Sequence, residues 1–129
     1  MSSSNPPLLS WKSLELALHN PFRVAHGTSS HRTALLLSLQ NGAGLGEASI
    51  PPYYGISSAD MIAFWEQVNG WQKPLPTQVE EIAGWVGTAG PAPARCALDL
   101  ALHDKIGRFQ QKPLHALLDL PKPQPLPTS

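Results

Sequence analysis

The fold is decided by residues 21–54, which read PFRVAHGTSSHRTALLLSLQNGAGLGEASIPPYY. The apolar run ALLLSL at 34–39 is typical of a central strand that is covered on both faces. Asn41-Gly42 follows it, and because both residues tolerate positive φ, they predict a tight turn. The flanking segments, residues 22–31 and 49–55, lack a hydrophobic pattern. They predict two irregular loops that a scaffold holds toward a ligand or partner.

Two further strands are expected around this segment. Residues 11–18 form the first, because Leu14, Leu16 and Leu18 alternate with small or polar residues, as in a strand with one buried face. Residues 44–49 form the third, and the Pro51-Pro52 pair ends the sheet since proline lacks the donor that a ladder needs. The three strands can pair as an antiparallel meander.

About four helices are predicted after the sheet. A capping box at 57–60 and another at 77–80 each precede apolar residues at helical spacing. The longest helix is expected from about Pro91 to Phe109, and Pro113 opens a short helix that Pro121 ends. The predicted fold class is therefore α+β, a three-stranded antiparallel β-meander followed by a bundle of about four helices.

The longest predicted helix has two different faces. Ala94, Ala97 and Ala101 form a shallow stripe that lets another element approach closely, beside an apolar ridge of leucine and isoleucine. Arg95 with Asp99, and Asp104 with Arg108, lie four residues apart and are expected to support the helix as ion pairs.

Length and composition limit the classes of protein. The 129 residues suit one domain, expected at 11–120 between a disordered tail at 1–10 and a proline-rich linker at 121–129. Nine basic and nine acidic residues cancel, which makes nucleic acids and anionic membranes poor partners. No signal peptide or apolar stretch of membrane-spanning length is apparent. The single cysteine is compatible with a cytoplasmic location.

Several patterns that suggest chemistry are better explained by structure. The glycines of Gly42-Ala43-Gly44-Leu45-Gly46 lack the spacing and the following helix of a nucleotide loop, so they indicate a turn and a strand. His26 and His31 lack the further ligands of a metal site. The serines beside them have no orienting carboxylate or nucleophile elbow. Cys96 lies among alanines and is interpreted as a small packed residue. The sequence thus predicts no catalytic and no metal-ligating residue in this chain.

Recognition groups remain in the two loops. Arg23 could bind a carboxylate through its planar guanidinium, and Tyr53-Tyr54 could form the wall of a pocket with a polar tip. A surface salt bridge and simple loop packing are equal alternatives at these positions. The full set of candidate substrate contacts is Phe22, Arg23, His26, Thr28, Ile50, Tyr53 and Tyr54.

The order of several motifs resembles a known family. PFRVAHGT at 21–28, GLGEA at 44–48, ALDLALHD at 97–104 and KPLHALL at 112–118 are together similar to the amino-terminal capping domain of the enolase superfamily. The muconate-lactonizing and mandelate racemase group fits best, and within it the dipeptide epimerases that act on L-Ala-D/L-Glu. The resemblance covers nearly everything from Leu14 to Ser129.

This resemblance implies a division of labour between two domains. In the family, two capping-domain loops, which correspond to residues 22–30 and 49–55, close over a (β/α)8 barrel and shape substrate specificity. The barrel carries the lysines that move a proton α to a carboxylate and the acidic residues that hold Mg²⁺. The resemblance thus implies a truncated or separately expressed cap that holds no cofactor itself, is inactive alone, and has as partners its own barrel and a carboxylate or dipeptide substrate.

Three alternatives stay open at this stage. The parent could be a muconate cycloisomerase or an o-succinylbenzoate synthase, since the deciding residues lie in the barrel. The chain could also be an independent binding module whose proline-rich tail docks in an aromatic groove. An isolated cap is further expected to expose an apolar patch, and so to form homo-oligomers, swap elements or aggregate.

Overall fold

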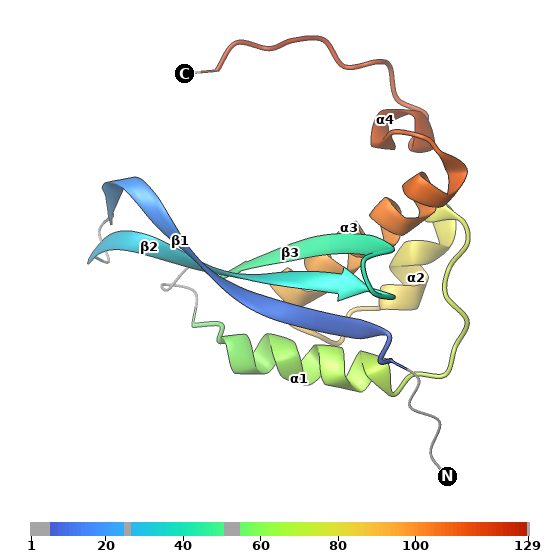
Figure 1. Cartoon of the computed structure of the whole chain (residues 1–129), viewed down its shortest axis with the longest axis horizontal. Helices are drawn as coiled ribbons and strands as arrows, with labels where there is room; N and C mark the ends of the chain where they lie inside the picture. The colour runs from blue at the N-terminus through green and yellow to red at the C-terminus, as the bar shows by residue number, and fades with distance from the viewer. Residues whose placement is uncertain (1–5, 25–26, 51–54, 129) are drawn as a thin grey trace.

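The structure, a computed structural model, describes residues 6–24, 27–50 and 55–128, and only the backbone of residues 21–24 and 27–29. Its first part is a three-stranded antiparallel sheet in the order β1-β2-β3. Helices follow, so that the predicted α+β arrangement is confirmed (Figure 1). The elements are β1 (Leu9–Val24), β2 (Gly27–Leu39), β3 (Gly44–Ile50), α1 (Ser58–Asn69), the 3-10 turn η2 (Val79–Glu81), α2 (Ile82–Val86), α3 (Ala92–Gln110) and α4 (Leu114–Leu117).

One face of the sheet is covered by helices. Figure 1 shows α1 and α3 on this side, and the buried strand residues Leu35, Leu37 and Leu39 all belong to it. The opposite face carries Leu36, which is only half-buried. β2 is the central strand, as predicted. The helices cover one face in the described part of the chain, and on the other face Ala34 is buried while Leu36 is half-buried.

The first strand turns a different face to the core from the one predicted. Leu9 is buried and Trp11 packs against the core, whereas Leu14 and Leu16 point to the opposite face, where Leu16 is 44% exposed. The register explains the error, since Leu9 pairs with the buried Leu39, and residues at even positions in β1 must face the other way. Alternation alone marks two faces but does not say which of them the helices cover.

The segment expected to be a loop at 22–31 is largely strand. β1 continues to Val24 and β2 begins at Gly27, which form a long antiparallel ribbon. The register shifts between Ala17 and Phe22, and Pro21 lies in this irregular part, where no ladder donor is required. Backbone pairing therefore extends both strands into a segment whose sequence has no hydrophobic alternation.

The alanine stripe of α3 packs directly on β3, as its small residues predict. A side chain at Gly44 would meet the carbonyl oxygen of Ala101, and one at Gly46 would meet that of Ala97. Both alanines are fully buried. The glycines therefore allow close approach of helix and strand, which confirms the structural interpretation of the glycine-rich run and excludes a nucleotide loop.

Two charged residues of α3 fasten the β2–β3 turn. Asp104 accepts a hydrogen bond from the backbone N–H of Leu45 at 2.8 Å, and Arg108 donates to the carbonyl of Gly42 at 3.1 Å. Arg108 and Asp104 also form the predicted ion pair, at 3.1 Å. The other predicted pair is replaced, since Arg95 donates to Gly90 and Asp99 pairs with His103.

The helix ends show one confirmed and one shifted cap. Ser57 and Asp60 form the predicted capping box of α1. The second box is shifted by one residue, because Glu81 rather than Glu80 accepts the backbone N–H groups of Thr77 and Gln78, each at 3.0 Å. These hydrogen bonds favour the charged carboxylate and hold the pKa of Glu81 below its usual range.

The two ends of the described chain differ, since the first is held to the core and the last is exposed. β1 begins two residues before the predicted boundary, since the amide of Asn69 exchanges two hydrogen bonds with the backbone of Leu9, at 2.7 and 3.1 Å. Residues 121–128 are exposed and form neither helix nor strand. Among the described residues, no helix has the length and apolar character needed to cross a bilayer.

Candidate functional site

The register of the sheet places the described parts of the two candidate segments toward one end of the sheet. Ile50, the last residue of β3, is opposite Thr33 of β2. In the described part of the chain, β2 residues 27–29, 31 and 32 pair with β1, and none of residues 27–32 pairs with β3, so the β1–β2 ribbon projects beyond the end of β3. Figure 1 shows this ribbon leaving the helical layer.

The candidate contacts fall into three groups in the structure. Phe22, Arg23 and Thr28 lie on the ribbon, where Arg23 is the direct register partner of Thr28 and Phe22 that of Ser29. Ile50 ends β3, half-buried against the edge of the core. His26, Tyr53 and Tyr54 lie outside the described residues. The structure thus brings Arg23 and Thr28 together through their backbones, at the same end of the sheet as Ile50.

Polar side chains mark the base of the ribbon. Thr33 donates a hydrogen bond to Glu15 across the two strands at 2.7 Å. Ser30 and His31 are joined side chain to side chain at 3.0 Å, and both are exposed. Local spacing does not indicate the Glu15 contact, because its partner Thr33 lies 18 residues away.

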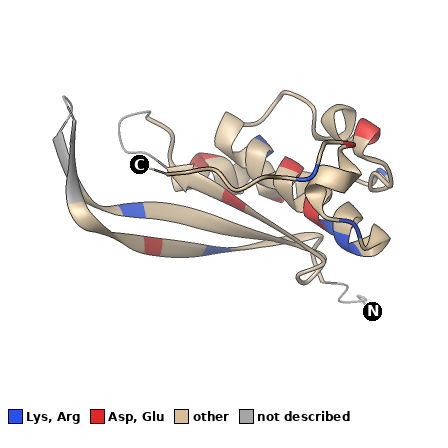
Figure 2. Ribbon diagram, turned by 90° about the horizontal axis from the view of Figure 1, so that it is seen from above, with Lys and Arg blue, Asp and Glu red and all other residues tan. Residues whose placement is uncertain are grey.

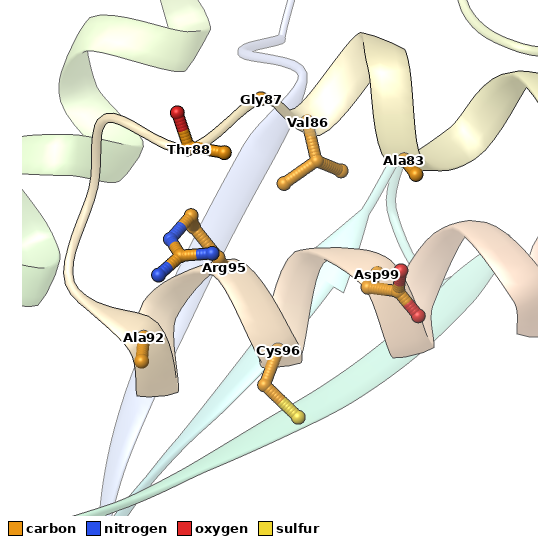
Figure 3. A pocket seen from close by; sticks show the side chains of 8 residues that line it. All are labelled: Ala83, Val86, Gly87, Thr88, Ala92, Arg95, Cys96 and Asp99. Carbon is orange, nitrogen blue, oxygen red and sulfur yellow. The ribbon is translucent and has the colours of Figure 1, made fainter.

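A separate open pocket of about 360 Å³ lies between α2 and the first half of α3 (Figure 3). Its charged groups already have partners, since Arg95 donates to Gly90 at 2.8 Å and Asp99 contacts His103 at 3.1 Å. Cys96 is exposed here, so its interpretation as a packed residue is wrong. The lining residues are Ala83, Val86, Gly87, Thr88, Ala92, Arg95, Cys96 and Asp99.

Among the described residues, the charged side chains do not gather into a site of their own. Acidic and basic residues are interspersed along the helices and strands (Figure 2). Within the ranges that the structure describes, no three histidine, cysteine or acidic side chains come together to hold a metal ion. The described residues form a ribbon that projects from one end of the sheet. A segment held in this way by a scaffold is suited to contacting a ligand or a neighbouring domain.

Comparisons with known proteins find relatives among the dipeptide epimerases. The chain is 33% identical over 112 residues to the L-Ala-D/L-Glu epimerase of Bacteroides thetaiotaomicron, a match that covers 84% of this chain and 29% of the relative. No family model matches the chain. The chain thus spans about a third of the length of the curated relatives that it matches.

Solved structures agree with the sequence match. An enolase family member from Agrobacterium tumefaciens with homology to dipeptide epimerases, solved with L-Ala-L-Glu bound, superposes with a TM-score of 0.65 at 25% identity, over 90% of this chain and 35% of that one. The dipeptide epimerase of Enterococcus faecalis, complexed with Mg and L-Leu-L-Tyr, shares the fold with a TM-score of 0.71 at 21% identity, over 87% and 34%. The matched part is the N-terminal third of these proteins.

Proposed function

We propose that the chain belongs to the enolase superfamily and is the substrate-specificity cap of a dipeptide epimerase, because it matches the N-terminal third of such enzymes. The observation that carries the proposal is the 33% identity to an L-Ala-D/L-Glu epimerase over most of this chain. The substrate class proposed is a dipeptide with an acidic second residue, and the reaction is epimerisation at the carbon α to its carboxylate.

The architecture supports a role in recognition. The ribbon and the end of β3 lie at one end of the sheet, while the core and the Asn69 and Asp104 contacts hold the opposite part together. A rigid scaffold with projecting segments can present side chains to a neighbouring active site at little entropic cost. The proposed substrate contacts are Phe22, Arg23, His26, Thr28, Ile50, Tyr53 and Tyr54.

The roles proposed for these residues follow from their chemistry. Arg23 binds the side-chain carboxylate of the substrate through its guanidinium, which matches a carboxylate with two parallel hydrogen bonds. The aromatic residues Phe22, Tyr53 and Tyr54 exclude water and bound the pocket. Ile50 contributes an apolar wall, and Thr28 and His26 supply hydrogen bonds.

The metal and the proton transfer are assigned to another domain. The described residues of this chain do not fit Mg²⁺, since no three possible ligands cluster among them. We therefore propose that a (β/α)8 barrel supplies the Mg²⁺ and the catalytic groups, and that this chain alone does not catalyse.

The proposal is tested in a fusion in which this chain replaces the N-terminal region of the Bacteroides thetaiotaomicron epimerase. Arg23→Ala should lower kcat/KM for L-Ala-L-Glu by roughly 10- to 150-fold, since a hydrogen bond to a charged group contributes about 1.5–3 kcal/mol. For L-Ala-L-Leu, which lacks the side-chain carboxylate, kcat/KM should change little. Arg23→Lys should restore part of the loss.

A matched control is Lys112→Ala, which removes an exposed cation at the α3–α4 connection, far along the chain from the ribbon. It should leave both substrates unaffected. An equal loss for the two dipeptides in Arg23→Ala, or no loss for either, would remove Arg23 from the substrate site. Muconate lactonising or o-succinylbenzoate synthase activity in the fusion, without epimerisation, would favour the alternative reactions.

A further inference from the structure

We propose that two copies of this chain pair through the outer edges of their β1 strands, antiparallel and centred on Leu14, and so join their sheets into one. The inference goes beyond the proposed function, since it concerns the assembly of the chain and needs neither a substrate nor a barrel. We call the outward-facing backbone of β1 from Trp11 to Ala17 the open edge. The partner that fits it is a second copy of the same strand.

The backbone of β1 shows which residues face outward. β1 is an outer strand of the sheet, so only one side of it pairs with β2 (Figure 1). The N–H and C=O of Leu9 bind the side-chain amide of Asn69, at 2.7 and 3.1 Å, and therefore point away from β2. Leu8 faces inward, because its C=O accepts the N–H of Gln40 at 2.8 Å. Backbone groups alternate along an antiparallel strand, and the register is unbroken from Leu9 to Ala17, so the odd-numbered residues point outward.

Four outward-facing residues make up the open edge. They are Trp11, Ser13, Glu15 and Ala17. Within residues 6–24, 27–50 and 55–128, no hydrogen-bond partner is found for their outward N–H and C=O groups. Such a row of unpaired backbone groups is a template on which another strand can pair. The edge has a limit at each end, because Asn69 occupies Leu9 and the register shifts after Ala17.

These two limits select one register for a second copy. An identical antiparallel strand fills an edge that runs from residue 11 to residue 17 only when the pair is centred on residue 14. Trp11 then lies opposite the partner's Ala17, and Ser13 lies opposite the partner's Glu15. Each of these pairs, and its symmetry mate, exchanges both N–H···O=C bonds across the two strands. Every backbone group of the open edge is then satisfied.

The side chains favour the same register. Ser13 and Glu15 are both exposed, and as direct neighbours the hydroxyl can donate to the partner's carboxylate, twice in the dimer. Centring the pair on Glu15 would place two like charges opposite each other, which is destabilising. Centring it on Ser13 would bring Ala17 against the partner's Leu9, whose backbone Asn69 already binds. The two neighbouring registers that keep the faces aligned are therefore disfavoured.

The pairing leaves the rest of the chain free to act. It uses the edge of β1 and covers neither face of the sheet. It also ends before Phe22, where β1 resumes its pairing with β2 beyond the register shift. The projecting ribbon that carries the proposed substrate contacts therefore lies outside the dimer contact.

Disulfide cross-linking tests the register directly. In a Cys96→Ser background, Leu14→Cys places two thiols at the centre of the dimer, in a non-hydrogen-bonded pair whose Cα atoms are about 4.5 Å apart, within the range that a disulfide bridges. The matched control is Leu16→Cys, since two cysteines at residue 16 would lie about 13 Å apart along the strands. Oxidation with copper phenanthroline should link Leu14→Cys roughly tenfold faster or more than Leu16→Cys. Random collision would favour Leu16, because its side chain is 44% exposed and Leu14 is half-buried.

Opposite charges at one exposed position provide a second test that depends on no disulfide. Ser13→Lys places an ammonium opposite the partner's Glu15, and Ser13→Glu places a carboxylate there, twice in each dimer. Sedimentation equilibrium of the 129-residue chain should show a dimer Kd roughly 2- to 30-fold lower for Ser13→Lys and raised by a similar factor for Ser13→Glu. Gln124→Lys and Gln124→Glu make the same changes in the exposed segment after α4 and should leave the Kd unchanged.

Three outcomes would overturn the inference. The first is a chain that stays monomeric over the whole concentration range. The second is a Leu16→Cys chain that cross-links as fast as Leu14→Cys, which would show collision in place of a fixed register. The third is loss of the Leu14→Cys cross-link in the folded fusion with the Bacteroides barrel, which would assign the open edge to the larger domain. None of these results depends on epimerase activity, so the proposed function stands or falls separately.

Discussion

Gly46 is the position at which the packing of helix on sheet can be tested most sharply. A side chain at residue 46 would meet the carbonyl oxygen of Ala97, and this neighbour is backbone, so it cannot turn away. Gly46→Ala must therefore push α3 away from β3 or distort the strand. Because Ala97 and Ala101 are completely buried, either movement opens gaps along the central packing interface of the domain.

The expected cost follows from this geometry. Overpacking of a close-packed core costs about 1–3 kcal/mol, and the unyielding backbone contact places Gly46→Ala near the upper value, about 3 kcal/mol. Alanine gains back at most about 1 kcal/mol of backbone entropy. A loss of about 2–3 kcal/mol lowers Tm by roughly 10 °C in a domain of this size.

Urea unfolding followed by tryptophan fluorescence measures the change, since Trp65 is fully buried. The matched control is Gly84→Ala, because a Cβ at Gly84 has no neighbour within 4 Å and the residue lies in α2. That substitution should stabilise the chain by up to about 1 kcal/mol through helix propensity. A Gly46→Ala protein as stable as the wild type would refute the close packing of α3 on β3.

Three further predictions concern single contacts. Asn69→Ala removes both hydrogen bonds to the backbone of the buried Leu9 and should cost about 2 kcal/mol in urea unfolding, and a neutral result would show that these bonds add nothing. The lowered pKa of Glu81, caused first by the Thr77 N–H, contributes stability above the unfolded pKa near 4.5 that is lost as pH falls through the folded pKa. Unfolding midpoints measured from pH 7 to 3 should therefore fall less steeply in Glu81→Gln, and parallel curves would contradict the cause. Exposed Cys96 should react with a thiol reagent in the native chain at nearly its unfolded rate, and a protected thiol would contradict its placement.

The local parts of the fold are predictable from sequence because their causes are local. The capping box at Ser57 and Asp60 and the alanine stripe of α3 depend on residues three or four apart, and both are found where they were expected. The turn after β2 is also where Asn41-Gly42 predicts it, although Gln40 takes positive φ as well. Residues 40–43 join β2 to β3 at this turn.

The errors concern relations between distant residues. Which face of β1 is buried depends on where the helices pack, and Leu9 is fixed by Asn69, 60 residues away. The hydrogen bond between the N–H of Leu45 and Asp104 joins residues 59 apart, and the spacing of residues in either segment does not indicate it. The ribbon was not predicted for another reason. Strands that do not pack on a core need no alternation of apolar residues, so their sequence resembles that of a loop.

The candidate site is described only in part. Residues 27–31 of β2 and Ile50 of β3 lie toward one end of the sheet, because an antiparallel meander returns β3 to the end at which β2 begins. The roles of Arg23, His26 and the two tyrosines stay predictions. They depend on a substrate and a domain whose contacts are not contained in the local pattern of this chain.

The most direct measurement of the central claim is an exchange of caps on one barrel. The Bacteroides epimerase and its fusion with this chain are compared across a panel of L-Ala-X dipeptides with acidic, apolar, aromatic and basic second residues, with kcat/KM for each. If this chain is a specificity cap, the fusion keeps epimerase activity and its order of preference among the dipeptides changes. The same order of preference with either cap would contradict the claim that this chain selects the substrate.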